Sequence, residues 1–100
     1  MIKEKQYLTR LKDVIFTDGK ILFFDNTEDV LKIRFRHYSD SELEITFYDV
    51  RSVQTSEDMY FEAADYKLAD SAGDKVLTLL DDENKTMFSV NFKESFVNVL

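Results

Sequence analysis

Two clusters of carboxylates come closest to a chemical motif in this chain. One occupies residues 25–29 (Asp-Asn-Thr-Glu-Asp) and the other residues 81–84 (Asp-Asp-Glu-Asn). Carboxylate and amide oxygens bind Ca²⁺, but neither cluster has the spacing of an EF-hand loop, with its glycine and terminal glutamate. Asp and Asn also favour turns through hydrogen bonds to nearby backbone groups. We therefore interpret both clusters as turns and predict no metal site and no cofactor.

A short basic strip is the second candidate for chemistry. Arg34, Arg36 and His37 lie at the end of a predicted strand, and guanidinium groups suit phosphate and carboxylate ligands. Glu44, on the next predicted strand, is placed to neutralise this anion-binding strip. His37 is the only histidine, the chain has no cysteine, and no Gly-x-Ser-x-Gly motif is present. We therefore expect no catalytic residue and favour a non-enzyme over an enzyme.

Surplus aromatic side chains support an alternative of a different class. Nine Phe and five Tyr exceed what one face of a small sheet needs. An aromatic-lined pocket for a small ligand or substrate would draw on Phe23, Phe24, Tyr48, Tyr60, Phe61 and Tyr66. A thick core or a dimer interface would use aromatic residues equally well. The sequence leaves these alternatives open.

Charge is distributed unevenly along the chain. Residues 1–36 contain eight Lys or Arg and six acids, whereas residues 37–100 contain five and fourteen, and the net charge is −7. Negative charge repels nucleic acid and attracts a basic protein. The densest acidic stretch outside the clearest strands supplies candidate partner-binding residues, namely Asp40, Glu42, Glu57, Asp58, Glu62 and Asp65. Solubility alone also explains an acidic surface, and that simpler interpretation stays open.

Length and composition predict one domain over residues 1–100. A chain of this size buries enough surface to fold without disulfides or a metal, and 44% hydrophobic residues argue against disorder. The apolar runs are far shorter than the ~20 residues of a membrane span. Residues 1–6 lack the apolar region of a secretory signal. We therefore expect a cytoplasmic protein with no membrane partner.

The elements that position these residues are expected to be mainly β-strands. Residues 14–17 and 20–24 flank Asp18-Gly19, a dipeptide typical of a type I′ hairpin turn. Residues 31–36 and 43–47 alternate with period two, which predicts a hairpin with one buried face. In the expected register of this second hairpin, Phe35 lies opposite Ile45.

The remaining segments are less uniform. Residues 76–80 and 87–92 predict a third hairpin around a turn at 81–85. Residues 57–69 fit a helix or a strand, because both periodicities are present. Residues 2–11 fit a short helix or an irregular lead-in. These alternatives leave the fold class as mainly β, or as α+β with one or two short helices.

The predicted architecture is an antiparallel meander of about five to seven strands, as a sheet or a half-open barrel. Such a meander has edge strands that must be charged, covered or paired. The apolar segment 96–100 (Phe-Val-Asn-Val-Leu) has the character of a strand that pairs with its own sheet or with a second copy. A homodimer is therefore one expected state.

The alternating pattern of residues 31–50 (L-x-I-x-F, a polar turn, then L-x-I-x-F-x-x-V) resembles a diffuse group of small bacterial β-rich proteins. That group includes products of mobile gene cassettes and immunity proteins to secreted toxins. The resemblance covers residues 14–53 and carries over no functional residue. It implies a non-enzymatic accessory protein, and a small acidic protein-interaction module is the leading hypothesis.

Overall fold

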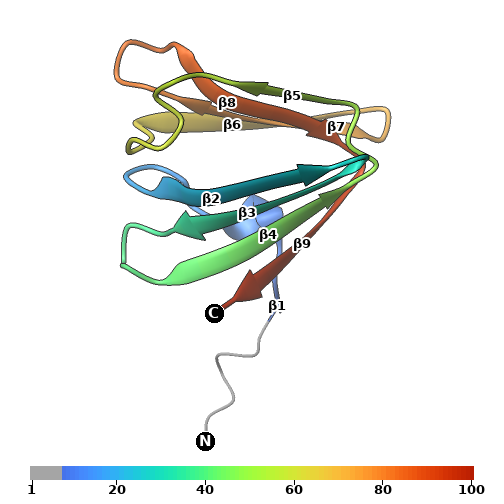
Figure 1. The fold of residues 1–100 in the computed structure, drawn as a ribbon, viewed down its shortest axis with the longest axis horizontal. Coiled ribbons are helices and arrows are strands. Elements are labelled where there is room, and N and C mark those ends of the chain that lie inside the picture. Colours follow the sequence, from blue (N-terminus) through green and yellow to red (C-terminus); the bar gives the residue numbers. More distant parts are fainter. Residues whose placement is uncertain (1–7) are drawn as a thin grey trace, which may run out of the picture.

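Two antiparallel sheets stack on each other in the structure, a computed structural model that describes residues 8–100 (Figure 1). The first sheet has the order β1-β9-β4-β3-β2, and the second has the order β5-β8-β7-β6. The strands are β1 (Leu8–Thr9), β2 (Lys20–Thr27), β3 (Val30–Arg36), β4 (Glu42–Tyr48), β5 (Ser52–Thr55), β6 (Asp65–Ser71), β7 (Asp74–Leu80), β8 (Thr86–Phe92) and β9 (Glu94–Val99). The expected mainly β, antiparallel fold is confirmed.

The hairpin of β3 and β4 is confirmed, with a different register. Phe35 pairs with Leu43, and Ile45 pairs with Ile33, so the strands are shifted by two residues from the expected alignment. A shift of two keeps every side chain on its own face of the sheet. The period-two pattern therefore identifies the faces, whereas the length of the 37–41 loop determines which residues pair.

The prediction of a hairpin around Asp18-Gly19 is wrong. Residues 14–18 form no strand, and β2 pairs with β3 through a turn at residues 28–29. Asp18 has the positive φ of 68° that the turn signal suggested. Gly19 has another role, because a Cβ there would lie against the ring of Phe35 and 2.5 Å from the carbonyl oxygen of Arg36.

The structure also decides the ambiguous segments. Residues 57–60 form turns, and a strand, β6, begins at Asp65, so no helix follows Thr55. The third hairpin is confirmed as β7 and β8 joined by residues 81–85. Residues 2–11 are predicted to form a short helix or an irregular lead-in; Leu8–Thr9 form the short strand β1, and residues 2–7 lie outside the described residues. A short 3-10 turn, η2 (Leu11–Asp13), follows β1.

A bent ribbon joins the two sheets at one end of the molecule. β4 pairs with β9 in the first sheet, and their continuations β5 and β8 pair in the second. At the bend, the Lys93 amide donates to the Tyr48 carbonyl at 3.1 Å, and the Arg51 amide donates to the Asn91 carbonyl at 2.8 Å. The sheets converge at this joint, on the right in Figure 1.

The C-terminal segment belongs to the first sheet of its own chain. β9 pairs with β4 and also with β1, and Val97 is 2% exposed. Because these hydrogen-bonding edges are used within the chain, segment 96–100 gives no support to a dimer built on its pairing. Self-association remains a prediction, but segment 96–100 no longer supports it.

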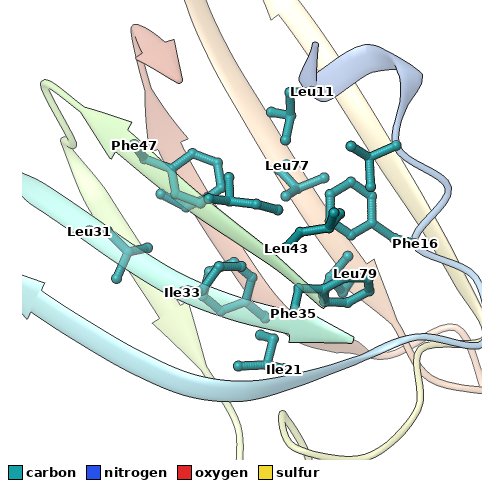
Figure 2. Close-up of a cluster of buried hydrophobic side chains, with 14 of the residues drawn as sticks. Leu11, Phe16, Ile21, Leu31, Ile33, Phe35, Leu43, Phe47, Leu77 and Leu79 are labelled. Carbon is teal, nitrogen blue, oxygen red and sulfur yellow. The ribbon is translucent and has the colours of Figure 1, made fainter. Parts of the chain in front are cut away.

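The core fills the space between the sheets with inward-pointing side chains from both. Figure 2 shows part of this cluster, in which residues of β3, β4 and β7 meet the ring of Phe16. Phe47 of the first sheet packs edge to face on Phe92, with ring centroids 4.8 Å apart. No helix among residues 8–100 is long and apolar enough to cross a membrane.

Candidate functional site

Four loops lie at the end of the sandwich opposite the joint. We call this end, at the left in Figure 1, the open end; its loops are residues 14–19, 37–41, 56–64 and 81–85. Strand register places loops 14–19 and 37–41 side by side, because Lys20 pairs with Arg36 in the first sheet. It does the same for loops 56–64 and 81–85, because Asp65 pairs with Leu80 in the second sheet.

Backbone hydrogen bonds tie the open end across the two sheets. The Asp18 amide donates to the Ala63 carbonyl at 2.7 Å, and the Ala63 amide donates to the Gly19 carbonyl at 2.8 Å. Ala63 is 2% exposed, and Met59 of the same loop is 6% exposed. These bonds and buried side chains fix loops 14–19 and 56–64 to each other and to the core.

Side-chain acceptors shape the other segments of this end. The Asp81 carboxylate accepts hydrogen bonds from the amides of Glu83 at 2.9 Å and Lys85 at 2.8 Å. The Ser56 hydroxyl donates to the Met87 carbonyl at 3.2 Å. Loop 81–85 is therefore a turn held by its own aspartate, as the sequence suggested.

An acidic hollow of about 360 Å³ lies between loops 14–19, 56–64 and 81–85. Its charged lining consists of Asp18, Asp58, Glu62, Asp81 and Asp82. The hollow unites two predicted partner-binding acids, from loop 56–64, with three acids that the sequence analysis assigned only to turns. Phe61 lines the hollow as well and is 67% exposed.

Exposed apolar side chains are frequent at the open end. Five of the eight large hydrophobic residues that are exposed in the described chain lie at the open end, namely Ile15, Tyr38, Tyr60, Phe61 and Leu100. Aromatic anchors surrounded by polar and charged groups are typical of protein–protein interfaces. The open end therefore has the composition of a binding surface.

The other predicted partner-binding acids are spread around this end. Asp40 and Glu57 lie in loops 37–41 and 56–64, and Asp65 begins β6, where its carboxylate accepts from the Tyr66 amide at 2.8 Å. Glu42 differs, because it lies on β4 with its carboxylate 3.9 Å from the guanidinium of Arg34.

Acidic residues lie across the strands from the two arginines of the predicted anion-binding strip. Arg34 pairs across the strands with Glu44, and Arg36 pairs with Glu42. His37 lies in loop 37–41, where its Nδ1 is 2.8 Å from the Ser39 hydroxyl. Each arginine thus faces a carboxylate on the neighbouring strand, and the histidine belongs to a local turn.

The proposed aromatic pocket residues are dispersed. Phe24 packs on Phe88 in the core, with ring centroids 6.2 Å apart, and Tyr66 packs on Phe16 at 5.3 Å. Tyr48, on β4, is 42% exposed, whereas Tyr60, in loop 56–64, is 47% exposed. Phe23 is 55% exposed on β2, and only Phe61 of the six lines the acidic hollow. These side chains therefore do not line one pocket.

The acids of the open end do not form a metal centre. Over residues 8–100, no group of three His, Asp or Glu side chains is placed to hold a metal ion. Comparisons of the chain with protein-family models, with curated proteins and with solved structures find no match.

Proposed function

We propose that this protein is a small acidic module that binds a more basic protein through its open end. The observation that carries the proposal is the acidic hollow, which five acidic residues from three loops line together with the exposed Phe61. We place the module in the cytoplasm, as an accessory protein of the immunity or inhibitor kind.

Charge and apolar contact have different roles in this proposal. Clustered carboxylates steer a basic surface toward the open end and raise the association rate. Buried aromatic anchors then supply most of the binding free energy and slow dissociation. Phe61 and Tyr60 are the anchors, because both are exposed on a loop that is held to the core through Ala63.

The fixed backbone of the open end favours binding. Ordering a loop on association costs free energy, and a preorganised surface avoids that cost. Loops 14–19 and 56–64 are already joined by two backbone hydrogen bonds, and loop 81–85 is held by Asp81. A basic partner would therefore meet carboxylates that are already in place.

Charge reversal at the open end tests the proposal. The triple variant Asp58→Lys, Glu62→Lys, Asp82→Lys changes three exposed acids that line the acidic hollow. We expect immobilised wild-type protein to capture a basic protein from a lysate of the source cells. The triple variant should retain less than a tenth of that protein, because the steering charge is inverted.

A matched control carries the same change in net charge elsewhere. Asp25, Asp29 and Asp70 are exposed and lie away from the open-end loops, so their triple replacement by Lys should leave capture within about twofold of wild type. Equal loss of capture in both triple variants would show that net charge alone acts and would overturn the proposed site. Failure of the wild-type protein to capture any basic protein would overturn the proposed function.

A further inference from the structure

A second hollow, of about 420 Å³, has the opposite charge. It lies on the side of the sandwich, between η2, β6, β7 and the junction of β8 and β9. Arg10, Lys12, Lys75 and Lys93 line it together with a single acid, Glu94. Four of the thirteen Lys and Arg of the chain thus meet in one place, although the chain carries twenty acids. We call this feature the basic hollow.

Lys75 occupies a position that normally holds an apolar side chain. It pairs across the strands with Phe92, which is fully buried, and it shares its face of β7 with the buried Leu77 and Leu79. Its ammonium group donates to the Lys93 carbonyl at 3.1 Å. An ammonium has three N–H donors, so two remain for another acceptor.

Within residues 8–100, the cations of the basic hollow form no ion pair with a carboxylate. The three ion pairs found within residues 8–100 involve other side chains. The acids of the open end lie at the far end of the strands, and charges separated by more than about 8 Å are largely screened at physiological ionic strength. Two acids lie beside these cations: Glu94 lines the hollow, and Asp70 pairs across the strands with Lys75 without forming an ion pair with it. The four cations outnumber them, so the local charge is positive.

The basic hollow also has an apolar wall. Leu11 of η2 is 6% exposed, and Leu68 of β6 is partly buried against the core. The methylene stems of lysine side chains add apolar surface beside their charged ends. The volume of the hollow falls within the range of small-molecule sites, about 300–1,000 Å³. Cations beside an apolar wall suit a ligand with one anionic and one apolar part.

We propose that the basic hollow binds a small organic anion, in which a phosphate or carboxylate headgroup is attached to a short apolar body. The headgroup accepts hydrogen bonds from Lys75 and Lys93 and is attracted by Arg10 and Lys12. The apolar body lies on Leu68. This site is separate from the open end, so it stands whether or not the open end binds a protein.

Titration of the ¹⁵N-labelled full-length protein with defined probes tests the site. We expect hexyl phosphate or hexanoate to cause saturable amide shifts in residues 10–12, 68, 75 and 93–95. Inorganic phosphate should bind at least threefold more weakly than the tighter of these probes, because it lacks the apolar part, and hexanol should not saturate. The tighter of the two organic anions identifies the preferred headgroup.

Two variants and a matched control make the test specific. Lys75→Met keeps the apolar stem of the side chain and should weaken binding about tenfold, as expected for loss of a charged hydrogen bond. Lys93→Gln, at an exposed position, should weaken it at least threefold. The control Lys67→Gln, on an exposed site of β6 outside the hollow, should change it less than twofold. No saturable shift, shifts confined to other surfaces, or equal weakening by the control would overturn the proposal.

Discussion

Replacement of Gly19 by alanine is expected to destabilise the fold at the base of the open end. A Cβ at this position would lie 2.5 Å from the Arg36 carbonyl oxygen and 2.6 Å from Cε2 of Phe35. Phe35 is fully buried, and its ring packs edge to face on Phe16 with centroids 4.9 Å apart. Because the ring is enclosed and the carbonyl belongs to β3, neither contact is relieved by a simple side-chain rotation.

The size of the effect follows from two opposing contributions. Overpacking a buried site costs about 1–3 kcal/mol, and a clash with both a ring and the backbone places Gly19→Ala near the upper value. Alanine also restricts the unfolded chain, which offsets about 0.4–1 kcal/mol. We expect a net loss of about 2 kcal/mol in the free energy of unfolding, equivalent to a fall of about 8–16 °C in Tm for a domain of this size.

Thermal and urea denaturation followed by circular dichroism measure this loss, with Gly73→Ala as the control. Gly73 has a φ of 87° and open space around it, so alanine there meets backbone strain without a clash. Backbone strain of this kind costs about 1–2 kcal/mol, and the restriction of the unfolded chain by alanine again offsets part of it. Gly73→Ala should therefore be less destabilised than Gly19→Ala. A Gly19→Ala protein as stable as wild type, or more stable than Gly73→Ala, would refute this reasoning.

Three further changes probe the core, a loop and the C-terminal strand. Phe47→Ala should lower the free energy of unfolding in urea by about 3–5 kcal/mol, because the ring is fully buried; a loss below about 1 kcal/mol would contradict its place in the core. Asp81→Ala should cost about 1 kcal/mol and speed hydrogen exchange at the Glu83 and Lys85 amides, whereas unchanged exchange would contradict the turn geometry. Deletion of residues 96–100 should unfold the protein by circular dichroism, and a folded monomer would show that β9 is dispensable.

The alternating sequence predicted the two faces of each strand well, because the buried face carries apolar residues and the exposed face carries polar ones. Leu31, Ile33 and Phe35 are all fully buried, and the intervening Lys32 and Arg34 are exposed. The residue types say less about the register in which β3 pairs with β4. The pairing of Phe35 with Leu43 depends on the length and backbone geometry of loop 37–41, which polar residues alone do not specify.

Asp18-Gly19 shows how one local signal can have two explanations. The dipeptide favours a hairpin turn, and Asp18 does adopt a positive φ. Gly19, however, is required by the close approach of Phe35, a residue sixteen positions along the chain. A contact between residues so far apart in the chain cannot be inferred from the residues around Gly19. The local sequence therefore predicts a hairpin where the structure has a loop.

The two hollows could not be assembled from the sequence because their residues come from distant segments. The acidic hollow combines Asp18 with loops 56–64 and 81–85, which meet only after both sheets have stacked. The basic hollow joins Arg10 to Lys93 across almost the whole chain. One signal was present, since Lys75 breaks the apolar alternation of β7 at a core-facing position.

The association rate between this protein and its captured basic partner, measured over a range of salt concentrations, decides whether the open end is the binding surface. We predict that the wild-type rate falls steeply as salt is raised. The Asp58→Lys, Glu62→Lys, Asp82→Lys variant should associate at least about tenfold more slowly at low salt and show little salt dependence. Rates and salt dependence equal to those of wild type would contradict binding through the open end.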